Sequence, residues 1–80
     1  MNKIEMQKAV EDKLDQFEPY KLTPRQKEVA LLLLEGKTRR QISGELGLSE
    51  STIKLHVSEL YKSLGINSRF ELFKLFDVKK

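Results

Sequence analysis

The chain has 80 residues, no cysteine, one histidine and a formal net charge of +3, which bounds it to one small domain. The lack of cysteine excludes disulfides and thiolate metal sites, and one histidine cannot build a zinc site, so we expect no metal and no other cofactor. Without a run of roughly 20 apolar residues or the apolar core of a signal peptide, the chain is expected to be cytoplasmic and to make no membrane contact.

The first predicted element is a helix over residues 3–17. Its apolar residues recur at positions 6, 10, 14 and 17 and form a narrow stripe on a charged segment. Pro19 ends this helix, and a short linker follows. Two roles remain open for the helix. Its stripe packs on Leu31 and Leu34, or it belongs to an interdomain helix or coiled-coil linker of a longer protein.

Two more helices are predicted, and each begins with a capping box. Thr23 and Gln26 have the spacing of such a box, with a proline at the first helical position, and Gly36 ends this helix. Thr38 and Gln41 repeat the spacing at the start of the next helix. The residues predicted to face inward on these two helices are Val29, Leu32, Leu33, Ile42 and Leu46.

The remaining sequence predicts two further helices. Ser49 caps the first of them, and Gly65 ends it. Its apolar residues at positions 53, 57, 60 and 64 form one clean stripe. Ser68 and Glu71 have the spacing of a third capping box, which opens the last helix. Because five helical patterns appear and no strand pattern does, the predicted fold class is all-α.

A helix-turn-helix motif is predicted over about residues 39–58. Two short helical patterns are joined there by a tight turn, and Gly47 suits the left-handed residue of that turn. The second pattern carries Lys54, His56 and several hydroxyls away from its apolar stripe, as a helix does when one face packs and the other enters a DNA groove.

Charge is distributed unevenly along the chain. Residues 1–20 hold three lysines against five acids, a balance of −2, whereas residues 21–80 hold eight lysines and four arginines against seven acids, a balance of +5. A basic surface suits a polyanion such as DNA, although it also serves solubility alone. We divide the chain accordingly into an N-terminal helix and linker, residues 1–20, and a main domain, residues 21–80.

Several short motifs in order give the chain a family resemblance. They are LTPRQKEV at residues 22–29, EGK at 35–37, TIKLHV at 52–57 and KSLG at 62–65. Together they resemble LuxR/GerE-type (NarL/FixJ-type) DNA-binding domains over about residues 22–76. The resemblance implies a four-helix domain, here preceded by an extra N-terminal helix, whose third helix lies in the major groove of double-stranded DNA. It also implies sequence-specific DNA binding in bacterial transcription regulation.

Side chains off the apolar stripe of the third helix are the predicted base contacts. Lys can donate to guanine, and an exposed Leu can meet a thymine methyl group. The predicted base-contacting residues are Ser51, Lys54, Leu55 and Ser58. Other residues are predicted to contact phosphates, either because they lie at helix starts or because their positions contact the DNA backbone in the family that the chain resembles. They are Arg39, Arg40, Thr52, His56 and Lys62. Arg69 is either another such contact or a solvated charge.

The last helix is too apolar to bury all of its surface in one small core. In the resembling family the last helix commonly forms the dimer contact, so we expect a homodimer. The predicted interface residues are Phe70, Phe73 and Phe76. Leu31 and Leu34 are unusual for that family, which suggests that something apolar covers the first helix of the domain.

An enzyme is not expected, because the chain carries no nucleophile motif and no Gly-rich phosphate loop. The alternative is a protein-interaction module, including a domain like region 4 of sigma factors, that docks RNA polymerase or another regulator through its apolar last helix. RNA polymerase is also a possible further partner of a DNA-binding regulator.

Overall fold

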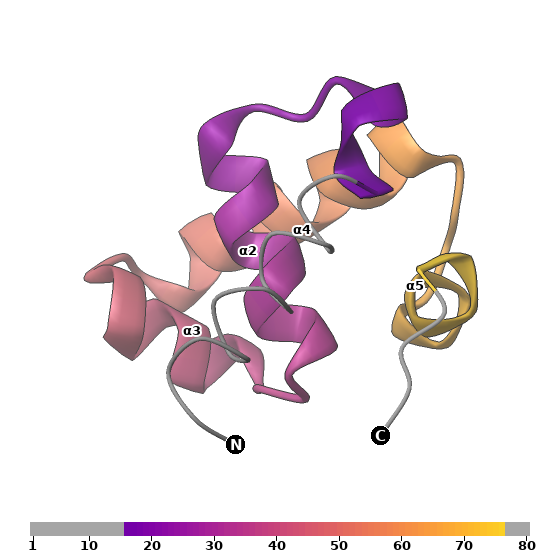
Figure 1. The fold of residues 1–80 in the computed structure, drawn as a ribbon. Coiled ribbons are helices and arrows are strands. Elements are labelled where there is room, and N and C mark those ends of the chain that lie inside the picture. The colour runs from indigo at the N-terminus through magenta and orange to yellow at the C-terminus, as the bar shows by residue number, and fades with distance from the viewer. Residues whose placement is uncertain (1–15, 77–80) are drawn as a thin grey trace, which may run out of the picture.

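The computed structural model describes residues 16–76. This part of the chain is all-α, as predicted, and has no strand. A short 3-10 helix, η1 (Glu18–Tyr20), leads into four α-helices (Figure 1). Their bounds are α2 Pro24–Leu34, α3 Arg39–Leu46, α4 Glu50–Leu64 and α5 Arg69–Leu75. The N-terminal helix predicted over residues 3–17 lies outside the described residues except for its last two, which have helical backbone.

Three helices begin where the capping residues predicted. Both reciprocal bonds of the capping box form at Thr23, whose hydroxyl accepts from the Gln26 amide at 3.1 Å while its own amide donates to the Gln26 side chain at 2.9 Å. Thr38 and Gln41 form the second box at the same two distances. Ser49 caps α4 through the Thr52 amide.

The third capping box differs from its prediction. The Ser68 hydroxyl accepts from the Glu71 amide at 3.3 Å, as expected. The Glu71 carboxylate, however, accepts from the amide of Asn67 at 2.6 Å and not from the Ser68 amide. Ser68 has φ −152°, whereas Thr23, Thr38 and Ser49 have φ of −68°, −79° and −72°, and the reciprocal bond falls one residue earlier in the chain.

The turn of the predicted helix-turn-helix motif forms at Gly47. This residue has φ +67° and ψ +33°, the left-handed conformation in which glycine pays no steric penalty, and its amide donates to the Ser43 carbonyl. The following amide, of Leu48, also donates to the Ser43 carbonyl, at 3.0 Å. Ser49 then caps α4, which begins at Glu50, so only three residues separate α3 from α4.

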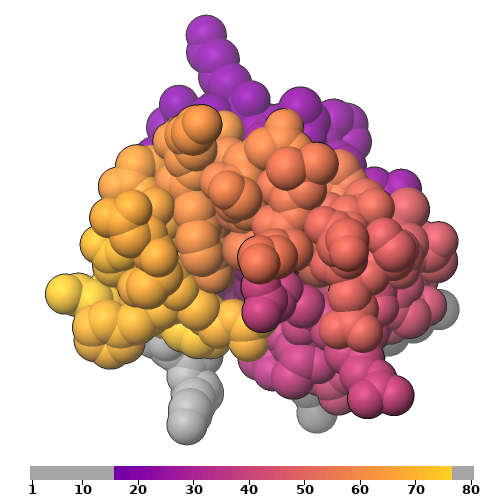
Figure 2. Space-filling model, turned by 180° about the vertical axis from the view of Figure 1, so that it is seen from behind, coloured from indigo at the N-terminus to yellow at the C-terminus, as the bar shows by residue number. Residues whose placement is uncertain are grey.

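The core lies where α4 meets α2 and α3, and α5 packs on α2. Figure 1 shows α3 and α5 on opposite sides of α2 and α4, and Figure 2 shows the same separation from behind. The buried face of α2 is shifted from its prediction, since Leu34 is buried whereas Leu32 is only half-buried. On α4, Val57 is half-buried, whereas the other members of the predicted stripe are buried.

Phe76 lies in this core, which corrects its predicted place in a dimer interface. Its side chain is only 3% exposed. Its ring meets Phe17 edge to face, with centroids 4.8 Å apart, and meets Tyr20 at 5.8 Å. Because Phe17 is fully buried, the last residue of the predicted N-terminal stripe belongs to the core of the main domain.

Lys37 lies in the loop between α2 and α3 and contacts residues of the end of α2, of α3 and of α5. Its Nζ donates to Glu45 of α3 at 2.7 Å and lies 3.7 Å from Glu35, and the bond to Glu45 raises the pKa of Lys37. Its carbonyl accepts from Arg69 Nη2 at 2.6 Å. Arg69 is therefore half-buried and anchors the start of α5, which corrects its prediction as a merely solvated charge; the alternative of a phosphate contact stays a prediction.

Candidate DNA-binding interface

Two faces of α4 differ sharply in exposure. Ile53, Leu60 and Leu64 are buried against the other helices. The four residues predicted to contact bases are all exposed on α4, namely Ser51, Lys54, Leu55 and Ser58. Leu55 is 60% exposed. Helical spacing thus places a cation, two hydroxyls and an aliphatic group on the outer surface of one rigid element.

The start of α3 adds positive charge beside this face. Arg39 and Arg40 are both exposed. Arg39 lines a shallow hollow together with Ser51 and Lys54 of α4, so the fold brings these three predicted site residues together. The two helices are held in this arrangement by the short turn at Gly47 and by their mutual packing.

Glu50 is a member of this hollow that the sequence prediction missed. It is the first residue of α4 and is exposed. An acid at a helix N-terminus is favoured by the helix dipole, so a structural role explains it without any ligand. Its place in the hollow could have been found from the sequence, because Glu50 directly precedes Ser51 and lies about one helical turn before Lys54.

Thr52 and His56 are less exposed than the predicted base contacts. The Thr52 amide donates to the Ser49 hydroxyl at 3.1 Å, and the two hydroxyl oxygens lie 2.8 Å apart, so Thr52 completes the cap of α4. His56 is half-buried, and its Nδ1 lies 4.0 Å from a carboxylate oxygen of Glu59. Thr52 therefore has its partner in the cap residue of α4, and His56 has its partner within α4.

Lys62 is exposed near the end of α4. It lines a second hollow together with Ser58 of the same helix and Asn67 of the following loop. This hollow shares no residue with the one around Arg39. The predicted contacts therefore follow α4 along its length, and in Figure 2 the coral to orange surface of α4 crosses the middle of the visible face.

The surface of α5 carries apolar groups of a different kind. Phe70 is 70% exposed, with Lys74 Nζ 5.5 Å from the centre of its ring. Leu75 is also exposed, and Phe73 is half-buried against the core. Of the three predicted interface residues, only Phe70 and Phe73 thus present any surface to a partner.

Residues 16–76 contain no group of three or more His, Asp or Glu side chains placed to hold a metal ion. Within the same range, no helix is long and apolar enough to cross a membrane.

The chain is similar to known regulatory proteins. GerE, a spore germination protein of Bacillus subtilis, is 42% identical over 48 residues, which cover 60% of this chain and 65% of GerE. The nitrate/nitrite response regulator NarL of Escherichia coli is 36% identical over 50 residues, covering 62% of this chain and 23% of NarL. A putative HTH-type transcriptional regulator of Aeromonas salmonicida is 39% identical over 71 residues, covering 89% of this chain.

The matched region spans only part of these relatives, with 36% of the Aeromonas salmonicida protein covered. No solved structure shows a significant match. Residues 20–76 match the family described as bacterial regulatory proteins, luxR family, which confirms the resemblance and the fold class expected from the motifs. The chain belongs to the luxR family of bacterial regulatory proteins, which are DNA-binding regulators of transcription.

Proposed function

We propose that the chain binds double-stranded DNA with α4 in the major groove. The observation that carries this proposal is the exposure of all four predicted base contacts on one helix whose other face is buried. Lys54 donates to a guanine, the methyl groups of Leu55 meet a thymine methyl, and the two serines supply hydroxyls. Phosphate contacts come from α3 and from the flanks of α4.

The phosphate contacts hold the domain in register on the duplex. Arg39 and Arg40 lie at the start of α3, beside the base-reading face, and Lys62 lies near the end of α4. Thr52 combines its cap with a phosphate contact at the start of α4, and His56 contacts the backbone from the side of the same helix. The DNA partner places this activity in the cytoplasm.

We propose further that two copies bind together through α5. Phe70 and Phe73 then meet their counterparts in a second chain, and the burial of Phe76 leaves it in the core. A symmetric pair of this kind binds two inverted half-sites, whose spacing follows from the separation of the two α4 helices.

Selection of bound duplexes from a random pool tests the proposal directly. We expect enrichment of one inverted repeat, with loss of affinity as salt concentration rises. Mass measurement of the complex then gives the number of chains on each duplex. If no duplex is enriched over the pool, sequence-specific binding by this chain is refuted.

A second function is favoured by one observation, the exposure of Phe70 and Leu75 on α5. The same surface can dock RNA polymerase or another regulator, as in the alternative of a module like region 4 of sigma factors. Binding to purified polymerase core enzyme separates the two. Docking of this kind survives Lys54→Ala and is lost in Phe70→Glu, whereas binding to a single DNA half-site is weakened by Lys54→Ala and retained in Phe70→Glu.

A further inference from the structure

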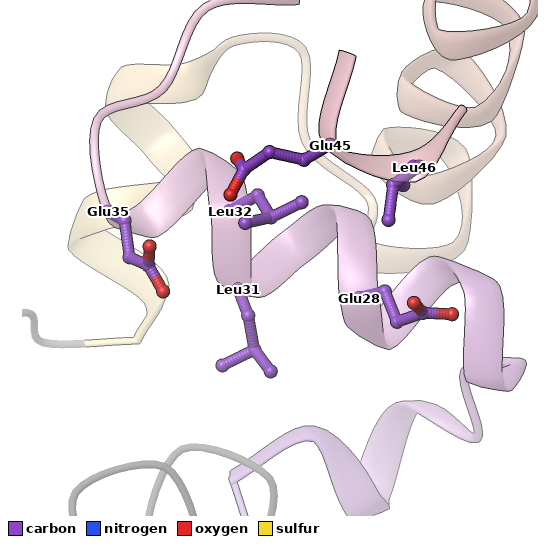
Figure 3. Close-up of a pocket in the computed structure, with 6 residues that line it drawn as sticks. All are labelled: Glu28, Leu31, Leu32, Glu35, Glu45 and Leu46. Carbon is purple, nitrogen blue, oxygen red and sulfur yellow. The ribbon is translucent and has the colours of Figure 1, made fainter. Parts of the chain in front are cut away.

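A groove between α2 and α3 has a leucine floor and an acidic rim (Figure 3). Leu31 and Leu32 of α2 and Leu46 of α3 supply the apolar lining, and all three side chains are half-buried. The carboxylates on the rim belong to Glu28, Glu35 and Glu45. None of these residues belongs to the DNA-contacting set proposed above, so the groove has a separate role to explain.

The charge of the rim is not fully compensated within the described residues. Lys37 pairs with both Glu45 and Glu35, at 2.7 and 3.7 Å. Glu28 has one long ion pair, 3.8 Å from Arg25, in which both side chains are well exposed. Two cations thus serve three carboxylates around an apolar floor, a combination that suits an amphipathic helix with basic residues beside its apolar stripe.

Residues 3–15 of this chain have that pattern. At 100° per residue, an ideal helix puts Met6, Val10 and Leu14 on one side. Lys3 and Lys13 fall on the same side, next to the apolar stripe. The acids at positions 5, 12 and 15 fall on the opposite side, and Glu11 lies at the flank of the stripe away from Lys13. The segment is acidic overall, but the face that would meet the groove is apolar and basic.

The place where the described chain begins supports the same occupant. Gln16 and Phe17 have helical backbone, and Phe17 is fully buried against Phe76. In Figure 3 the side chain of Leu31 points toward the pale indigo ribbon that precedes α2. Leu14 precedes Phe17 by less than one helical turn, so a helix anchored at Phe17 carries Leu14 to this side of α2.

We propose that residues 3–15 dock as a helix on the leucine groove, with Val10 and Leu14 over Leu31 and with Lys13 toward the acidic rim. Docking removes the apolar floor from water and adds a cation to a rim on which the carboxylates outnumber the cations that pair with them. The proposal extends the core of the domain beyond the four helices of the family resemblance. It does not depend on DNA binding or on dimerisation.

Engineered thiols test this placement without disturbing the native chain, which has no cysteine. The test variant is Leu14→Cys with Leu31→Cys, and the matched control is Asp12→Cys with Leu31→Cys. Asp12 lies two residues from Leu14 but on the opposite side of the predicted helix. Under mild oxidation we expect both thiols of the test variant to be lost to an intramolecular disulfide, while the control keeps its thiols, since Cα atoms more than about 7 Å apart cannot be bridged.

Three results of the oxidation experiment would overturn the proposal. Equal oxidation of both variants would mean that residues 3–15 do not present one fixed face to the groove. No oxidation of either variant would mean that residues 3–15 do not dock on the groove. A disulfide between two chains means that a second copy occupies the groove. Thermal melting of the full chain adds an independent measurement, in which Leu14→Ala lowers the melting temperature and Asp12→Ala does not. Equal melting temperatures for these two variants would also contradict docking.

Discussion

At the scale of single residues, Lys54 carries the most direct prediction. It is exposed on α4 and lines a hollow with Arg39, so its ammonium has no role in the fold of residues 16–76. We expect Lys54→Ala to weaken binding to the selected duplex by about 1–3 kcal/mol and to relax the preference at one base position. Lys21→Ala, in the turn after η1, is the matched control and leaves both unchanged. Titration of each variant against specific and scrambled duplexes measures the effect, and an equal loss on both duplexes would reassign Lys54 to a phosphate.

Replacing each of two phenylalanines of the last helical region with alanine is predicted to change stability by very different amounts. Phe76 is buried among aromatic rings, so we expect Phe76→Ala to lower the free energy of unfolding by about 3–5 kcal/mol. Phe70 is 70% exposed, so Phe70→Ala stays within about 0.5 kcal/mol of the native chain. Urea denaturation at low protein concentration, where a dimer contributes little, compares the two. Equal destabilisation would contradict the placement of Phe76 in the core.

Some placements of single residues could be predicted from the sequence and others could not. The outer face of α4 follows from helical periodicity, and the four predicted base contacts are all exposed there. The burial of Phe76 could not be predicted in the same way, because its partner Phe17 is 59 positions away in the sequence. The role of Arg69 was missed for the same reason, since its acceptor is a backbone carbonyl of a distant loop.

At the scale of elements, the starts of helices were the most predictable feature. Capping boxes are local, because each bond joins residues three positions apart, and two of the three boxes form as their spacing predicts. The box at Ser68 departs where the backbone has φ −152°, which no pattern of side chains reveals. The buried face of α2 was predicted less well, because four successive leucines leave the phase of the helix undetermined.

Two glycines of the helix-turn-helix motif predict changes of opposite sign. Gly47 has φ +67°, so Gly47→Ala puts a side chain in the left-handed region and costs about 1–2 kcal/mol. Gly44 lies inside α3 with ordinary φ and open space around it, so Gly44→Ala stabilises the domain by about 1 kcal/mol. Thermal melting of both variants checks the prediction. A stabilising Gly47→Ala would show that the turn does not hold this conformation in solution.

The proposed dimer helix gives a prediction at the same scale. Phe70→Glu puts a charge on the exposed surface of α5 without disturbing the core. We expect cooperative binding to the inverted repeat to be lost, because two carboxylates then face each other across an apolar interface, while affinity for a single half-site is retained. Glu18→Gln, in η1, serves as a surface control away from the proposed DNA and dimer contacts. Unchanged cooperativity, measured by binding to one and to two half-sites, would remove α5 from the interface.

At the scale of the whole molecule, the proposed DNA contacts and the proposed dimer contacts occupy separate regions. The helix α4, which carries the proposed base contacts, lies between α3 on one side and α5, which carries the proposed dimer contacts, on the other (Figure 1). Arg69 and Lys37 link these sides, since a side chain from the start of α5 holds the loop that precedes α3. The fold therefore fixes the direction in which α5 presents its aromatic surface relative to the base-reading face of α4.

Uneven charge along the chain leads to the last prediction, which concerns salt. The logarithm of the DNA-binding constant falls linearly with the logarithm of salt concentration, with a slope of about −0.9 for each phosphate that the protein neutralises. Arg39 and Arg40 are exposed at the start of α3 and are proposed to contact two phosphates, so removing both reduces the magnitude of the slope by about 2 per bound chain.

We expect the Arg39→Ala/Arg40→Ala variant to lose affinity equally on specific and scrambled duplexes, because phosphate contacts carry no sequence information. The control is Arg25→Ala, which removes a cation that pairs with Glu28 on α2. We expect this variant to keep the native slope. Binding measured over a series of salt concentrations gives both slopes. A native slope in the double variant would mean that α3 does not cross the DNA backbone, and would require a different orientation of α4 on the duplex.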